Sequence, residues 1–402
     1  LMCQYATEKL KLDDPIHEKH ADYYIHYLHE REAEWFDNRQ MKMKADVDAD
    51  FDNIRHGWSW CVQHRRIHGL SKVVRGLFSC RVMSDNPAFF DKLFQEVAPI
   101  LDIHPILPDN REDAICLPLL YIIVGAISHS IDFLSEDSDD VQLIDAGVRM
   151  IRQLNTPREC AFALSLAGVN YGRIKSRREE GESLIKEAIA LLRQSNQKAD
   201  LAYAVSHLSD FEHYQESIQL AEELGDLYLQ AYSQLKLGQK LYIEVDIESG
   251  LRYLRASLSL FHQIKSQRGI LTCSNLLFDA LLDNGELASA TVVMNEQLKL
   301  ALDIGFPFGT ATTYWFAAFD RRANGLYEEA EELAQKAQDI GMTIMENQWH
   351  LANMWENLGE ISFAQGRYDK ALERYQKALA LGEAENLGDT IARSKQLIAD
   401  VY

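Results

Sequence analysis

The stretch MWENLGEISFAQGRYDKALERYQKALALGE, residues 354–383, combines a helical spacing of apolar residues with two internal glycines and regularly placed alanines. Gly359 is small, so a second helix can pack closely on the first. Gly366 can end the first helix, because glycine adopts the backbone conformation of a tight turn without steric cost. Tyr375 fills the space between the second helix and its neighbours. We therefore predict a helix–turn–helix unit whose apolar face must be covered by the next unit of the same kind.

The turn of this unit belongs to a repeated phrase. The phrase has glycine in its second position, leucine or tyrosine two residues after the glycine, and alanine five residues after it. Its copies are 40 and 41 residues apart: NGELASA (284–290), NGLYEEA (324–330) and QGRYDKA (365–371). A fixed period of this length is typical of arrays of stacked helix pairs.

The opening stretch also carries a family pattern, W-x-x-L-G followed by A-x-x-x-F/Y-x-x-A, and so resembles the tetratricopeptide repeat. Two positions depart from that pattern, because Ser362 replaces the usual tyrosine and Glu383 replaces the closing proline. Repeats near 40 residues, rather than about 34, imply longer helices and an altered superhelical pitch. The residues that carry the resemblance are Trp355, Leu358, Gly359, Ala371, Tyr375 and Ala378.

Weaker copies of the unit lie upstream at 235–261 and 164–192, with a shortened copy between them. The resemblance implies an all-α fold, a right-handed α-solenoid of helix pairs with an N-terminal helical subdomain. We expect a helical region of linker and degenerate repeats over 1–155, about six repeats over 156–385, and a terminal helix over 386–402. That last helix is either a cap or the first helix of a further unit that is cut short, and we favour the second interpretation.

Composition narrows the function classes. The chain of 402 residues carries 41 lysines and arginines against 61 aspartates and glutamates, a net charge of −20. A field of this sign repels phosphate backbones and anionic membranes, so we expect no direct nucleic-acid binding and no membrane binding. The six cysteines are scattered without a C-x-x-C pair, and the longest apolar run, 115–127, is too short to span a membrane. We therefore expect a cytoplasmic protein.

The first third of the chain lacks the clear period but still contains helical stretches, such as 15–36 and 48–66. Its segments CQYATEKL, HEKHADYYIHYL and DADFDNIRHGWSWC resemble the junction between the winged helix and the tetratricopeptide-type sensor array of STAND signalling ATPases. The resemblance implies that residues 1–10 end a winged helix and that an ATPase lies upstream. The matching residues are Gln4, Tyr5, Ala6, Glu8, Leu10, His20, Ala21, Tyr23, Tyr24, Asp52, Asn53, Ile54, Arg55 and Trp60.

Catalytic motifs are missing from the sequence. It has no G-x-x-x-x-G-K-[ST] phosphate loop, no G-x-G-x-x-G and no G-x-S-x-G nucleophile elbow. Cys61 near His64 could form a thiol–imidazole pair, but helical cores commonly bury single cysteines. Histidine pairs such as His17 and His20 supply two metal ligands and no third, and the acidic stretch 46–52 lacks the glycine and glutamate of a calcium loop. We expect no enzyme activity, no metal and no cofactor.

Candidate binding residues follow from the family resemblance, because the first helix of each tetratricopeptide unit lines the concave groove. Their mixture of aromatic, amide and charged side chains suits a protein, a peptide or a small-molecule inducer. Trp315 and Phe319 could equally pack between units, and that alternative stays open. The candidates are Tyr242, Asn275, Asp279, Thr312, Trp315, Phe319, Arg322, Asn353, Glu356 and Glu360, with Tyr232 and Gln239 before them.

The two resemblances together favour a non-catalytic sensor or scaffold array of a STAND-type signalling or transcription regulator. In such a regulator, a ligand or partner in the groove relieves the restraint that the array places on the ATPase. The alternative is a free-standing adaptor that mediates protein–protein interaction. An enzyme is the third hypothesis, supported only by the scattered cysteines and histidines. We expect the chain by itself to be monomeric.

Overall fold

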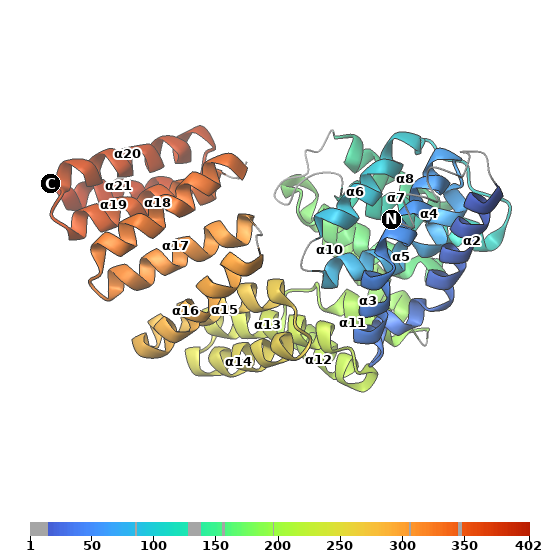
Figure 1. The fold of residues 1–402 in the computed structure, drawn as a ribbon, viewed down its shortest axis with the longest axis horizontal. Coiled ribbons are helices and arrows are strands. Elements are labelled where there is room, and N and C mark those ends of the chain that lie inside the picture. Colours follow the sequence, from blue (N-terminus) through green and yellow to red (C-terminus); the bar gives the residue numbers. More distant parts are fainter. Residues whose placement is uncertain are drawn as a thin grey trace. The chain divides into compact units, whose positions relative to one another are not determined.

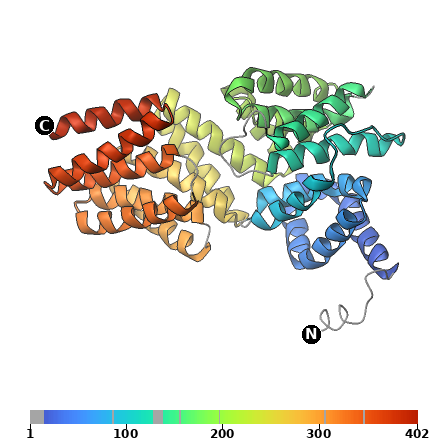
Figure 2. The ribbon, with the colours of Figure 1, turned by 90° about the horizontal axis from the view of Figure 1, so that it is seen from above.

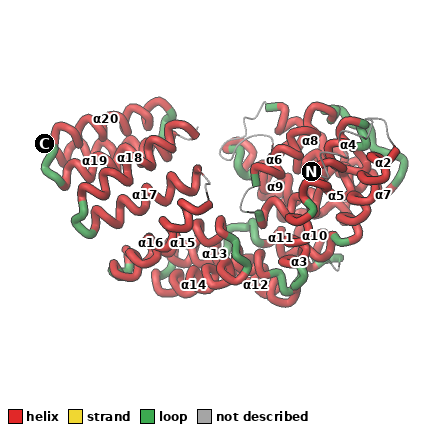
Figure 3. Tube along the Cα trace, viewed as in Figure 1, coloured by secondary structure: helices red, strands yellow, loops and turns green. Residues whose placement is uncertain are grey.

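The computed structural model describes residues 15–84, 87–127, 138–154, 157–195, 197–304, 307–344 and 348–402. Every regular element in these ranges is a helix, and no strand occurs among them (Figure 3). This confirms the predicted all-α fold. None of the described helices combines the length and the hydropathy that a membrane crossing requires. The segment predicted to end a winged helix, residues 1–10, lies outside the described residues.

The chain forms two compact units, residues 1–233 and residues 234–402, and the division falls inside one helix. The predicted domain boundaries after residues 155 and 385 stay predictions. The N-terminal unit (Figure 1) contains α2 (Pro15–Glu30), η1 (Glu32–Phe36), α3 (Gln40–Ala49), α4 (Phe51–Gln63), α5 (Ile67–Met83), α6 (Ala88–Val97), η2 (Ala98–Ile100), α7 (Arg111–Ile127), α8 (Asp139–Gln153), η3 (Pro157–Cys160), α9 (Ala161–Tyr171), η4 (Lys175–Arg177), α10 (Arg178–Leu192), α11 (Lys198–Val205) and α12 (Phe211–Leu224).

The stretch 15–36, whose spacing predicts one helix, is divided in the structure. α2 ends at Glu30, and a short 3-10 helix, η1, follows. The break lets Trp35 turn into the core, where the indole is 2% exposed. The indole lies against Gly76 of α5, where a Cβ atom would come within 3.2 Å of the indole nitrogen. Burial of a tryptophan at this site therefore overrides continuation of the helix.

The C-terminal unit begins within α13 (Leu227–Glu244), which crosses the division. Its other elements are α14 (Ile247–Gln263), α15 (Gln267–Asp283), α16 (Leu287–Ile304), α17 (Pro307–Ala323), α18 (Tyr327–Ile344), α19 (Gln348–Ala364), α20 (Tyr368–Ala384) and α21 (Gly388–Val401).

Helices of the C-terminal unit alternate between two layers (Figures 1 and 2). The first helices α15, α17, α19 and α21 contact one another in order, and we call them the first-helix layer. The second helices α16, α18 and α20 each contact their own first helix and the next one. Each pair therefore covers the apolar face of its neighbour, as the repeat predicts. The terminal helix α21 contacts α19 and α20 in the position of a first helix, and whether it is a cap or part of a further unit stays a prediction.

The three repeated glycines end the first helices α15, α17 and α19. Gly285, Gly325 and Gly366 have φ values of +77°, +76° and +71°, in the left-handed region that favours glycine. In each turn the glycine and the next residue donate their backbone N–H groups to carbonyls of the last helical turn, as from Gly366 to Phe363 at 2.9 Å. The turn prediction is thus confirmed, and its physical cause is the helix cap.

The close contact predicted inside the opening unit is also present. A Cβ atom on Gly359 would overlap the ring of Tyr375, and that tyrosine is 1% exposed. The departure at Ser362 has its own role. Ser362 is buried beside the guanidinium of Arg374, which donates to its hydroxyl and, at 2.7 Å, to the carbonyl of Leu358. A small residue at position 362 thus leaves room for a buried arginine.

The glycine contact gives a stability prediction. Replacing Gly359 with leucine forces the new side chain into the ring of Tyr375, and overpacking of this kind costs about 1–3 kcal/mol. We expect the midpoint of urea unfolding, followed by circular dichroism, to fall. The matched control is Gly388→Leu, because nothing lies within 4 Å of a Cβ atom at that position. Equal midpoints for the two variants would show that the helices do not depend on close approach at Gly359.

Candidate functional site

The ten candidate residues all lie on first helices of the repeat pairs. α13 carries Tyr242, α15 carries Asn275 and Asp279, α17 carries Thr312, Trp315, Phe319 and Arg322, and α19 carries Asn353, Glu356 and Glu360. Several of these side chains touch one another, and others pack separately.

Charged residues link three neighbouring first helices. Arg322 of α17 pairs with Glu360 of α19 at 2.8 Å, and Arg393 of α21 reaches the same carboxylate at 3.7 Å. Arg393 also pairs with Glu356 at 3.3 Å, and the Ser394 hydroxyl donates to Glu356 at 2.6 Å. We call these five residues the charged ladder. Burial raises the pKa of Glu356, while Ser394 and Arg393 oppose that rise.

Two aromatic residues adjoin the charged ladder on α17. The rings of Trp315 and Phe319 meet edge to face with centroids 5.3 Å apart, and the guanidinium of Arg322 lies 5.0 Å from the Phe319 centroid. Both rings are half-buried. Trp315 also packs against a small cluster that includes Ala337 and Met354. The two rings therefore combine interhelical packing with partial exposure, so neither of the two sequence-based interpretations describes them completely.

A second, acidic group lies where α13 meets α15. The hydroxyl of Tyr242 donates to the carboxylate of Asp283, and Asp279 lies one helical turn before Asp283. Burial, with the negative charge of Asp283 as the second cause, raises the pKa of Asp279 to about 7. Asn275 instead accepts a hydrogen bond from the buried Gln297 of α16. Asn275 therefore helps to hold α15 and α16 together.

The two remaining candidates, Thr312 and Asn353, are half-buried. The structure therefore brings Arg322, Glu356 and Glu360 together with Arg393, which the sequence analysis did not single out. Arg393 occupies the last first helix, α21, and the same repeat spacing that identified the other candidates could have found it.

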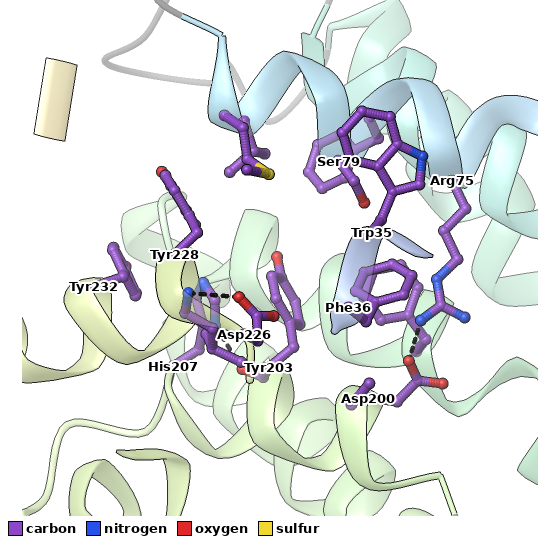
Figure 4. Close-up of a pocket in the computed structure, with 16 residues that line it drawn as sticks. Trp35, Phe36, Arg75, Ser79, Asp200, Tyr203, His207, Asp226, Tyr228 and Tyr232 are labelled. Atoms are coloured by element: carbon purple, nitrogen blue, oxygen red, sulfur yellow. Dashed lines mark hydrogen bonds and ion pairs between the residues drawn. The ribbon is translucent and has the colours of Figure 1, made fainter. Parts of the chain in front are cut away.

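A cavity in the N-terminal unit was not predicted. It encloses about 190 Å³ among η1, α5, α9, α11 and the first turns of α13 (Figure 4). Seven of its sixteen lining residues are aromatic. The aromatic residues are Trp35, Phe36, Phe78, Phe162, Tyr203, Tyr228 and Tyr232.

One side of this cavity carries a cation held between two rings. The guanidinium of Arg75 lies 4.4 Å from the ring centroid of Phe36 and 4.4 Å from that of Phe162. Arg75 also pairs with the buried carboxylate of Asp200 and, at 3.4 Å, with Glu32. Two carboxylates thus neutralise its charge, and residues 125 positions apart are tied together.

The other side carries Asp226, which caps the N-terminus of α13. The Asp226 side chain accepts from the backbone N–H of Leu229 at 2.9 Å and from the Gln40 amide at 3.3 Å. Burial raises the pKa of Asp226 to about 6, against these hydrogen bonds. Beside it, the ring centroids of Tyr203 and His207 are 4.5 Å apart.

The sequence shows only one pattern related to the cavity, the spacing of its aromatic residues. Tyr203 and His207, and likewise Tyr228 and Tyr232, are spaced one helical turn apart. The opposite wall comes from Trp35 and from α5, more than a hundred residues earlier. No periodicity relates the two walls, so the cavity could be found only from the fold.

The cysteine and histidine pair considered in the sequence does not form a nucleophilic site. Cys61 is fully buried, and burial raises the pKa of its thiol to about 11. The exposed His64 instead stacks on Trp60, with its Nδ1 atom 2.9 Å from the Trp60 carbonyl oxygen. A thiol that stays protonated at neutral pH is a poor nucleophile.

Residues 309–381 and 350–402 match the family model of the tetratricopeptide repeat. The C-terminal part of the chain is thus a tetratricopeptide-repeat array, as predicted. No curated protein matches the sequence.

Solved structures resemble the fold at low sequence identity. A Rap protein complexed with Competence and Sporulation Factor matches 85% of this chain and 85% of its own, with 15% identity and a TM-score of 0.50. A STAND protein with a tetratricopeptide repeat sensor from Pyrococcus horikoshii matches 77% of this chain, which covers 49% of that protein, with 17% identity and a TM-score of 0.48. BtubC from P. vanneervenii matches 58% of this chain and 94% of its own, with 18% identity and a TM-score of 0.42.

These likenesses concern the fold. The described residues form paired helices, and residues 309–402 match the tetratricopeptide repeat, a repeat that typically serves as a protein-binding scaffold.

The raised pKa of Asp279 gives a pH prediction. Its native value of about 7 exceeds the ordinary value of 3.8, so the native state holds this proton more tightly than the unfolded chain. The stabilisation is present at low pH and is lost as the pH rises through 7. An asparagine at this position cannot ionise, so we expect Asp279→Asn to be more stable than the wild type by about 1–2 kcal/mol at pH 8.5, and the difference to shrink by pH 5.5.

Urea unfolding at the two pH values measures this difference. Asp339→Asn, at an exposed position of α18, is the matched control and should show no such pH-dependent gain. A difference for Asp279→Asn that is the same at both pH values would contradict the burial of this carboxyl group.

Proposed function

We propose that this chain is the sensor or scaffold array of a STAND-type signalling or transcription regulator, and that it binds a protein or peptide along its first-helix layer. The observation that carries the proposal is the charged ladder and the aromatic pair that adjoins it. Together they place paired charges, of which Arg393 is the most exposed, and half-buried aromatic surface on consecutive helices.

The residue types on this layer match those that dominate protein interfaces. Tryptophan and arginine are enriched among the residues that contribute most to binding. Trp315 and Arg322 meet that description on α17. The side chain of Arg393 is about half exposed, at 53%, and can still pair with an acidic group of a partner.

Electrostatics favour a basic partner overall. The chain carries a net charge of −20, so a peptide rich in lysine and arginine is attracted over long range. The exposed carboxylate of Asp283, beside Tyr242, offers such a peptide a negatively charged contact at the end of α15. The arginines of the charged ladder then favour a carboxylate at one end of the same ligand.

Regulation requires that binding shifts an equilibrium. Conversion of a regulator from mostly off to mostly on takes about 5.5 kcal/mol of differential binding free energy, which a few buried contacts can supply. Support for such a role comes from the STAND-like junction in the first 65 residues. The solved complex of a Rap protein of this fold with Competence and Sporulation Factor supports ligand binding by the array.

The alternative ligand is a small-molecule inducer in the same groove, and the alternative context is a free-standing adaptor. We also expect a cytoplasmic, monomeric chain.

Peptides selected from a random library against the whole chain provide the test of the binding surface. We expect Trp315→Ala combined with Arg322→Ala to weaken the selected peptides by at least about tenfold, the effect of losing one hot-spot contact, with little loss of helix content. Isothermal titration calorimetry measures affinity, and circular dichroism measures helix content.

Trp355→Ala combined with Lys377→Ala is the matched control. It removes another tryptophan and its cation, which lie 4.4 Å apart on α19 and α20, where Trp355 packs between helix pairs. We expect this control to lower the melting temperature without weakening the peptides. Unchanged peptide affinity in the Trp315 and Arg322 variant would reject the first-helix layer as the binding surface. A parent reading frame without a phosphate loop would reject the STAND context alone.

A further inference from the structure

The aromatic cavity of the N-terminal unit lies outside the surface proposed above, and its chemistry defines a separate ligand. We propose that it binds a small organic ammonium ion, an amine with one aromatic ring or an apolar body of similar size. The argument depends on the size of the cavity, its rings and the balance of its charges.

The volume sets the size of the ligand. An engineered cavity of about 150 Å³ accepts benzene, so about 190 Å³ admits one aromatic ring and a short side arm. Figure 4 shows Tyr228 on one side of the open space, Trp35 and Ser79 on the other, and Asp226 and Tyr203 near its base. A cavity walled in this way suits an apolar body with a single polar group.

The rings set the preferred charge of that polar group. Aromatic faces attract cations through their quadrupole, and a desolvated site strengthens this attraction. Arg75, held between Phe36 and Phe162, already shows that rings of this cavity hold a cation. Further rings, among them Trp35 and Tyr203, line the same cavity and can meet a second cation.

The carboxylates of the cavity also favour a positively charged ligand. Asp200 is matched by Arg75, whereas no lysine or arginine of the described residues pairs with Asp226. Asp226 is only 6% exposed and receives its hydrogen bonds from uncharged groups, the Leu229 N–H and the Gln40 amide. A buried carboxylate with neutral partners is stabilised by a cation that enters the cavity. An anionic ligand would be repelled by this carboxylate. The one arginine that lines the cavity, Arg75, is already paired with Asp200 and would not offset that repulsion.

Occupancy also has a structural consequence. The ligand would touch η1 and α5 on one side and α11 and α13 on the other, segments that Arg75 with Asp200 and Gln40 with Asp226 already join. Because it binds the folded unit only, the ligand should raise the melting temperature, and the rise should grow with the logarithm of ligand concentration above the Kd.

Three probes of similar size and different charge test the proposal on the intact chain. They are 2-phenylethylamine, which is cationic at neutral pH, the neutral 2-phenylethanol and the anionic phenylacetate. Ligand-observed NMR titration at pH 7.5 measures affinity, and thermal unfolding measures stabilisation. We expect the amine to bind saturably, the alcohol to bind about tenfold more weakly, and the anion more weakly still.

Two variants locate the site. Asp226→Asn keeps a capping side chain but removes the charge, and it should weaken the amine about tenfold while leaving the alcohol unchanged. The matched control is Asp246→Asn, because Asp246 caps α14 in the same way, accepting from the Ser249 N–H at 2.7 Å. Ser79→Phe should fill the cavity and abolish binding of all three probes.

The proposal is overturned by any of three results: no saturable binding of the amine, equal affinity for the three probes, or full amine affinity in folded Asp226→Asn. Amine binding that survives Ser79→Phe would place the ligand elsewhere and would equally reject this cavity.

Discussion

The structure depends on close approach between the two helices of each pair. In the C-terminal unit the ring of Tyr375 lies over Gly359, and Leu254 lies over Gly238, where an added Cβ atom would approach within 3.0 Å. The N-terminal unit uses the same device at Gly168, where a Cβ atom would meet the backbone of α10 at 2.6 Å. Small residues thus set the spacing of the pairs, and tight packing transmits that spacing to every side chain on the first helices.

Once this spacing is fixed, other positions of the first helices can vary. Residues 275, 315 and 356 follow one another at the repeat period, and they are asparagine, tryptophan and glutamate. Residues 279, 319 and 360, one turn later, are aspartate, phenylalanine and glutamate. The repeat therefore supplies a constant framework, and these two positions give each helix its own chemistry. The charged ladder arises where two of the variable positions, Glu356 and Glu360, meet an arginine from each neighbouring first helix.

Sequence periodicity predicted the features that local interactions determine. The glycine turns follow from backbone conformation at Gly285, Gly325 and Gly366, and the helix pairs follow from the 40-residue period. Long-range contacts lay beyond such patterns. The break after Glu30 depends on a core site for Trp35 beside α5, and the cavity depends on walls from opposite ends of the N-terminal unit. The candidates of the first-helix layer were identified because they occupy equivalent positions in successive repeats. The N-terminal helices lack such a repeat, so no equivalent positions could be compared there.

The central claim is that the first-helix layer of the C-terminal unit forms the binding surface for a protein or peptide. Hydrogen–deuterium exchange of the whole chain, with and without a library-selected peptide, tests that claim most directly. The account predicts slower exchange in α15, α17, α19 and α21, with the second helices α16, α18 and α20 unchanged. Protection confined to the second helices, or to the N-terminal unit, would contradict it.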